Sequence, residues 1–173
     1  MFKGFTTEGG IRAPAIISAK MLKKAHLQGT LNRDTVHVMD LMPTMLDLAG
    51  VSLGKTFHGR PVQTISGKSM RPLLEGQSMG ERQIGWELFG RKALRKGDWK
   101  ITLVNKPYGN ADWQLYNLKI DPTESQDLAS NEPAKLKEML LAWNQYAKEN
   151  NVLDGKFELK YGFKTCLYEY CFK

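Results

Sequence analysis

Two adjacent glycines, Gly9 and Gly10, lie near the start of this 173-residue chain, between Glu8 and Arg12. Together with Lys3, these residues put an ammonium, a carboxylate and a guanidinium around backbone that carries no side chains. Glycine readily adopts positive φ angles and lets the backbone approach a bound group closely, and a lysine ammonium is a mobile point charge. The segment therefore predicts a tight turn that holds an anion.

The residues after the glycine pair predict one strand and one helix. Residues 14–19 are apolar after a proline, which is typical of a short buried strand that begins where no ladder donor is needed. A basic loop over residues 20–29 follows. Residues 40–50 combine an Asp N-cap, a proline in the first turn, apolar residues at helical spacing and a final glycine. We expect a short, largely buried helix there.

The apolar period changes to two in the second half of the chain. Strands are predicted over residues 86–89, 92–95, 99–104 and 113–118, with a turn at 96–98 and a stop at Asp121-Pro122. A helix is predicted after Pro133, because apolar side chains then recur on one helical face: Leu136, Met139, Leu140, Trp143, Tyr146 and Ala147. These elements predict an antiparallel meander with a helix packed on it.

Five segments in this order resemble the sulfatase family. Lys3 to Arg12 is similar to the family's K-G-x-x-x-E-G-G-x-R motif, and residues 37–50 and 67–76 are similar to the segments that follow it. The order of residues 86–129 resembles the family's small C-terminal domain. The resemblance spans roughly residues 3 to 150. It implies the C-terminal part of a type I sulfatase, arylsulfatase-like and of the alkaline phosphatase-like superfamily, with the N-terminal catalytic portion upstream.

The resemblance also implies a fold and a division into domains. The fold class is α+β. Residues 1–80 are expected to hold a remnant strand and helix of the α/β sulfatase domain and the interdomain connection. Residues 81–173 are expected to form a small antiparallel sheet packed on a C-terminal helix. The tail from residue 154 matches no family motif, and we expect a last strand or a lid there.

The resemblance implies roles for four residues. Lys3 matches the catalytic lysine that contacts the substrate sulfate, although in the isolated chain it would be an exposed lysine. Glu8 and Arg12 are candidates for the substrate pocket, or for a buried ion pair that braces the glycine turn. His58 is a further pocket candidate, with a surface or hinge position as the alternative.

The sequence contains no metal site or nucleophile of its own. The C/S-x-P-x-R motif that carries the family's formylglycine does not occur, and the histidines lack metal-ligand spacing. Calcium and formylglycine are therefore implied only for the full-length enzyme. Gly50 to Gly54 matches G-x-S-x-G, but a predicted helix precedes the serine where that motif requires a strand. Cys166 and Cys171 are not spaced as CxxC, so one disulfide and two free thiols both fit.

Composition is that of a globular chain, with 42% hydrophobic and 25% charged residues. No apolar run is long enough to span a membrane. The net charge of +7 is spread along the sequence, which favours a solvated surface over a nucleic-acid face. The compartment is not encoded here, although a periplasmic or secreted location is favoured for the full-length protein.

Three functions remain open. The first is the C-terminal segment of an arylsulfatase that hydrolyses sulfate esters, supplying Lys3 and a wall of the substrate pocket, with the isolated chain inactive. The second is part of a related phosphate-ester hydrolase. The third is a noncatalytic basic module that binds an acidic glycan or a protein partner. Because a strand and helix cut from a sheet leave an apolar face, we also expect the isolated chain to self-associate.

Overall fold

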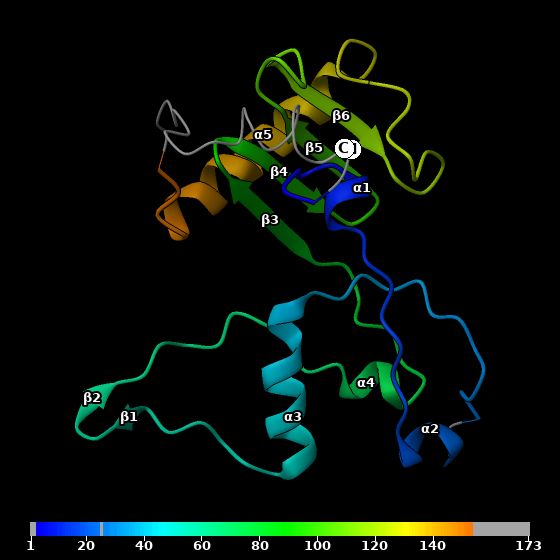
Figure 1. The fold of residues 1–173 in the computed structure, drawn as a ribbon, viewed down its shortest axis with the longest axis vertical. Coiled ribbons are helices and arrows are strands. Elements are labelled where there is room, and N and C mark those ends of the chain that lie inside the picture. The colour runs from blue at the N-terminus through cyan, green and yellow to red at the C-terminus, as the bar shows by residue number, and fades with distance from the viewer. Residues whose placement is uncertain (1–2, 25, 154–173) are drawn as a thin grey trace, which may run out of the picture. The chain divides into compact units, whose positions relative to one another are not determined.

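The computed structural model describes residues 3–24 and 26–153, and the chain divides into two compact units (Figure 1). One unit combines Met1–Pro14 with Gln83–Lys173, and the other is Ala15–Arg82. The first residues of the chain thus belong with its second half. The predicted strand or lid after residue 154 and the two cysteines lie outside the described residues.

A four-stranded antiparallel sheet forms the centre of the first unit. Its strands follow one another in chain order, as a meander does: β3 (Gln83–Leu88), β4 (Arg91–Lys96), β5 (Trp99–Leu103) and β6 (Trp113–Asn117). Gly90 and Gly97 lie in the first two turns with φ angles of 75° and 58°, which glycine adopts without a steric cost. The predicted meander is confirmed.

The helix α5 (Pro133–Glu149) packs on this sheet (Figure 1). Its Met139 and Trp143 are buried against Leu94, Ile101 and Leu115 of the strands. Aromatic packing extends this core, since the ring centroids of Trp143 and Trp113 are 5.4 Å apart and offset aromatic pairs are favourable at such distances. The α+β fold class, with a sheet packed on a C-terminal helix, is confirmed.

The second unit consists of short elements joined by long loops. In chain order they are α2 (Lys20–Lys24), the 3-10 helix η1 (Val38–Asp40), α3 (Leu41–Ala49), β1 (Thr56–Phe57), β2 (Arg60–Pro61) and α4 (Arg71–Leu74). The helix predicted over residues 40–50 is confirmed as α3. Gly50 ends it in the left-handed conformation, with φ 66°, as expected for a C-terminal glycine.

Two expectations for this unit are wrong. The helix α3 is not largely buried, because only Thr44 is buried along it and Met45 remains 67% exposed. Residues 14–19 form no strand, and Ile16 is 99% exposed. The reason is the same in both cases: a strand needs a hydrogen-bonded neighbour and an apolar helix face needs a covering layer, and the described residues supply neither.

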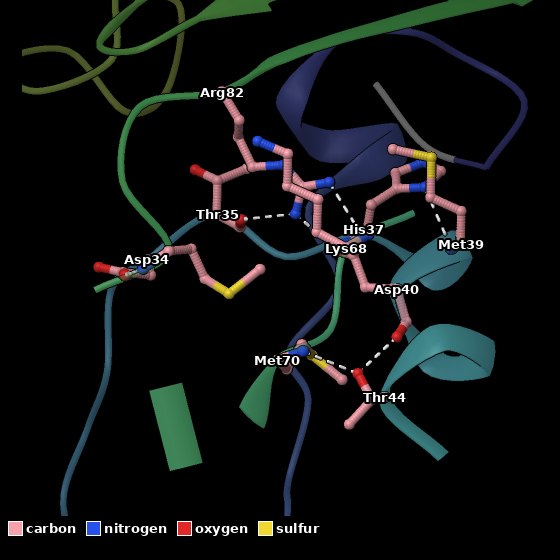
Figure 2. A network of polar contacts seen from close by, with 10 residues as sticks. Asp34, Thr35, His37, Met39, Asp40, Thr44, Lys68, Met70 and Arg82 are labelled. Carbon is pink, nitrogen blue, oxygen red and sulfur yellow. Dashed lines mark hydrogen bonds and ion pairs between the residues drawn. The ribbon is translucent and has the colours of Figure 1, made fainter. Parts of the chain in front are cut away.

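Asp40 has a different role from the predicted N-cap. Its carboxylate is fully buried and accepts two hydrogen bonds from the Arg82 guanidinium, at 2.6 Å to Oδ2 and 2.9 Å to Oδ1 (Figure 2). It also accepts from the backbone N–H groups of His37 at 2.7 Å and Lys68 at 2.9 Å. A buried charge is tolerated only with such partners, so Asp40 joins three separate stretches of this unit.

Thr44 extends this network from α3 toward α4. Its hydroxyl donates to the Asp40 carbonyl at 2.5 Å and accepts from the Met70 backbone N–H at 2.8 Å (Figure 2). The neighbouring Gly67 lies so close that a Cβ there would be 2.0 Å from the Met39 carbonyl oxygen. Only glycine fits at that position, so the segment before α4 is held against η1.

Replacing Arg82 by methionine should destabilise this unit severely. The change leaves the Asp40 carboxylate buried without its cation, for which a loss of about 3–5 kcal/mol is expected. The measurement is urea unfolding, followed by hydrogen exchange at α3. Arg71→Met is the matched control, since Arg71 pairs with Asp47 on the surface and surface pairs contribute little. Equal losses in the two variants would contradict this account.

The pair of Asp40 and Arg82 should make the free energy of unfolding depend on pH in the acidic range. Burial acts to raise the pKa of Asp40, but the hydrogen bonds from Arg82, Lys68 and His37 outweigh it and hold that pKa below its ordinary value. The stabilisation is therefore complete above the unfolded pKa of about 3.9 and is lost as the pH falls through the lower folded value. The free energy of unfolding of Arg82→Met should lack this contribution and its dependence on pH.

Candidate functional site

The segment from Lys3 to Arg12 lies in the same unit as the antiparallel sheet and contains the short helix α1 (Glu8–Ile11) (Figure 1). Gly9 and Gly10 are helical there, because the Thr7 carbonyl accepts from the Gly10 N–H at 2.8 Å and the Ile11 N–H at 3.2 Å. The prediction of positive φ angles at the glycine pair is therefore wrong. It occurs instead at Gly4, with φ 88°.

The first contact of this segment with the sheet is made by Arg91 at the start of β4. Its guanidinium donates to the Gly4 carbonyl at 2.6 Å and lies 4.1 Å from the centre of the Phe5 ring. Phe5 is buried, and burial lowers the pKa of Arg91 from its ordinary value. A partly desolvated cation above an aromatic face contributes about 1–2 kcal/mol, so Arg91 fixes the backbone beside Lys3.

The second contact is made by the buried hydroxyl of Thr6. This oxygen lies 3.2 Å from the hydroxyl of Thr102 on β5 and 3.3 Å from the Lys92 carbonyl on β4. Thr6 and Thr102 are both buried. Because buried hydroxyls need partners, these two threonines fix the position of the segment relative to β4 and β5.

The third contact is a buried cluster of three charged side chains. The Lys100 ammonium on β5 lies 2.8 Å from a Glu8 oxygen and 2.8 Å from a Glu124 oxygen. The three side chains are 0%, 8% and 5% exposed. Glu124 also accepts from the Glu8 backbone N–H at 2.7 Å. Each charge depends on the others, because removing one partner of a buried pair leaves an uncompensated charge.

The turn that presents Glu124 is organised by Asp121. The Asp121 carboxylate accepts from the backbone N–H groups of Ser125 and Gln126 and from the hydroxyls of Ser125 and Thr123, at 2.7 to 3.1 Å. The bond from Gln126 and those from Ser125 lower the pKa of Asp121 to about 2. Glu124 sits in this turn with φ 57°, a left-handed conformation that is strained for a residue with a side chain.

A cavity of about 640 Å³ opens beside the cluster. Its lining includes Glu8, Arg12, Tyr108, Gln114, Tyr116 and Glu124. Burial, together with the carboxylates of this turn, raises the pKa of Tyr116 to about 12, so its phenol stays protonated. The Arg12 guanidinium is exposed and donates to the Pro122 carbonyl at 3.4 Å. The cavity lining thus combines the Arg12 cation and the neutral Tyr116 phenol with the carboxylates of Glu8 and Glu124.

The structure brings Glu8 and Arg12 to this cavity but does not pair them, since Glu8 binds Lys100. Lys3 is exposed. His58 belongs to the other unit, in the turn between β1 and β2, where it is exposed with φ 47°. The roles of these four residues in a substrate site stay predictions.

Sequence reasoning missed the residues that hold the motif in place, namely Arg91, Lys100 and Glu124. Lys100 alternates with Trp99 and Ile101, so the predicted strand gave no sign of its burial. The structure shows that the three successive residues from Lys100 to Thr102 are buried. A lysine is almost never fully buried without a partner, and here Glu8 and Glu124 supply it.

The described part of the chain contains no group of three or more His, Cys, Asp or Glu side chains that could bind a metal ion. The resemblance implies calcium for the full-length enzyme alone. Nor does any helix within residues 3–24 and 26–153 have the length and apolarity needed to cross a bilayer.

Comparisons with solved structures support the class of fold. A chain solved in a study of glycosaminoglycan metabolism by Bacteroides thetaiotaomicron matches 63% of this chain and 24% of its own length, with a TM-score of 0.50 and 19% identity. At that identity the match shows the fold alone. No family model matches the sequence.

Sequence comparison finds sulfatases among the relatives of this chain. An uncharacterized sulfatase of Schizosaccharomyces pombe is 39% identical over 155 residues, which cover 87% of this chain and 27% of that protein. Human arylsulfatase A is 27% identical over 168 residues, covering 83% of this chain and 31% of its own length. The chain is related to the sulfatases, which confirms the resemblance seen in its motifs. It spans about a third or less of these relatives.

The turn at Asp121 gives a direct test of this geometry. The Asp121 carboxyl should titrate at about pH 2 in the folded chain, measured by the chemical shift of its carboxyl carbon. Ser125→Ala removes one hydroxyl donor to the carboxylate, so the titration should then move upward toward the ordinary value of about 3.9. An unchanged midpoint in Ser125→Ala would contradict the proposed hydrogen bonds.

Proposed function

We propose that this chain is the C-terminal part of a sulfatase, and that it supplies Lys3 as the ammonium that binds the sulfate group of an ester substrate. The observation that carries this proposal is the attachment of the segment from Gly4 to Glu8 to the sheet. Three independent contacts hold that backbone, while Lys3 remains exposed. Such an arrangement is what a fixed anion-binding lysine requires.

The chemistry explains why a fixed ammonium is useful. Hydrolysis of a sulfate ester places negative charge on the sulfuryl oxygens and on the leaving oxygen. A cation that is already in position stabilises this charge more in the transition state than in the bound substrate, which accelerates the reaction. Under this proposal the sheet contributes by holding Lys3, and the cavity beside Glu8 and Arg12 forms one wall of the substrate pocket.

The remaining parts of the site are expected from residues outside this chain. The resemblance implies a formylglycine nucleophile and calcium, and the described residues do not fit such a metal site. We therefore expect the isolated chain to hydrolyse nothing. An aryl sulfate is the expected substrate class of the complete enzyme, with hydrolysis of a phosphate ester as the alternative.

A second function has some support of its own. The net charge of +7 would favour an acidic glycan or an acidic protein partner. In that case the chain is a noncatalytic module. Salt-sensitive binding of a sulfated glycan by the 173-residue chain, together with a native protein that has no longer form, would favour this function over hydrolysis.

Removing Lys3 should reduce hydrolysis in the complete native protein. Loss of one preorganised charge-stabilising group typically costs about 10²–10³ in turnover, so Lys3→Ala should lower kcat/KM for an aryl sulfate by that factor. Lys55→Ala is the control, because Lys55 is an exposed lysine of the other unit. Equal activity of Lys3→Ala and the unaltered protein, or a marked preference for an aryl phosphate, would contradict the proposal.

The isolated chain should self-associate through the exposed side of α3. Met42 and Met45 are 57% and 67% exposed there, and apolar patches of this kind favour association. Light scattering of the purified chain should give a mass above that of a monomer, and Met45→Glu should lower it. Leu141→Glu, at an exposed apolar residue of α5, should not. A monomer at all concentrations would contradict this expectation.

A further inference from the structure

The buried lysine of β5 is not explained by stability alone. Burying two carboxylates and one ammonium costs several kcal/mol per ion, and apolar residues of similar volume often stabilise a protein as well or better. The side chain of Lys100 is nevertheless 0% exposed. A buried ion pair does, however, fix geometry, because the charges tolerate only a narrow range of separations.

The cluster determines where the sulfatase-like motif lies on the sheet. Glu8 is attached twice, by its side chain to Lys100 at 2.8 Å and by its backbone N–H to Glu124 at 2.7 Å. At the other end of the same short segment, the Gly4 carbonyl is held by Arg91 at 2.6 Å. Lys3 directly precedes this carbonyl, and consecutive Cα atoms are about 3.8 Å apart. The Lys3 backbone is therefore one residue from a carbonyl group that Arg91 holds in place.

We propose that Lys100 and Glu124 are positioning residues for Lys3. They act on Lys3 through Glu8. This inference rests on the proposed function of Lys3, since it adds to that function the two residues of the C-terminal sheet and turn on which its placement depends. Neither residue belongs to the motif that Lys3, Glu8 and the glycine pair define.

The charges of the cluster predict how it fails. Lys100→Met leaves Glu8 and Glu124 facing each other without a cation in a buried site, where like charges repel strongly. The segment should then detach from the sheet. Glu124→Gln keeps the shape of the side chain and leaves one carboxylate with one ammonium, so the segment should stay attached. The two variants separate the loss of the cation from a simple change in packing.

The first part of the experiment uses the 173-residue chain. Hydrogen exchange should show that the amides of Gly10, Ile11 and Arg12, which are hydrogen-bonded in α1, exchange at least about tenfold faster in Lys100→Met. The amides of β5 should keep their protection. Lys96→Met is the matched control, since Lys96 pairs with Glu138 at the surface. Unchanged exchange in α1 overturns the proposal.

A general loss of protection in Lys100→Met would show unfolding of the sheet, and the milder Glu124→Gln and Glu8→Gln variants then decide. Glu8→Gln removes the charge in the motif that Lys100 binds. The α1 amides should therefore exchange faster in Glu8→Gln than in Glu124→Gln, and the β5 amides should stay protected in both variants. Equal exchange of α1 in these two variants overturns the proposal.

The second part uses the complete native protein and an aryl sulfate. Lys100→Met should lower kcat about 100-fold, as small displacements of catalytic groups do, whereas Lys96→Met should not. In a Lys3→Ala background, Lys100→Met should cause no further loss, because it acts through Lys3. An equal further loss in that background overturns the proposal. If the complete protein hydrolyses no sulfate ester, the proposed function fails, and the exchange result alone decides the positioning of the segment.

Discussion

The contact of the buried Lys100 ammonium with Glu8 and Glu124 is the interaction on which the candidate site depends. It joins three parts of the chain that are far apart in sequence: the motif near the start, the strand β5, and the turn after β6. No one of these charges is tolerable alone in a buried position. The chain must therefore place all three together, and Glu124 accepts a left-handed backbone conformation, with φ 57°, to do so.

This dependence explains why the first residues of the chain belong with its second half. Met1–Pro14 and Gln83–Lys173 form one compact unit, although they are separated by Ala15–Arg82. That intervening unit has its own buried ion pair, in which Arg82, its last residue, binds Asp40 in the 3-10 helix η1 (Figure 2). Buried charge pairs thus fix the path of the chain in both units, while apolar burial is concentrated between α5 and its sheet.

Much of the fold was predictable because its signals are local. The alternation over β3 to β6, the helical spacing from Leu136 to Ala147 and the glycine at position 50 each report a nearby structural requirement. Tertiary requirements were not predictable in this way. The exposed Ile16 lacks a paired strand, the Asp40 side chain binds Arg82 and the His37 N–H instead of capping α3, and Glu8 pairs with Lys100 instead of Arg12. Each of these depends on a partner that sequence spacing does not reveal.

The central claim is that the Lys100 ammonium is buried and bound by two carboxylates. The most direct measurement is nitrogen-15 NMR of the lysine side chains in the intact chain. Our account predicts a Lys100 ammonium signal with slowly exchanging protons and contacts to the side chains of Glu8 and Glu124. An ammonium that exchanges with water as fast as the exposed Lys55, with no such contacts, would contradict it.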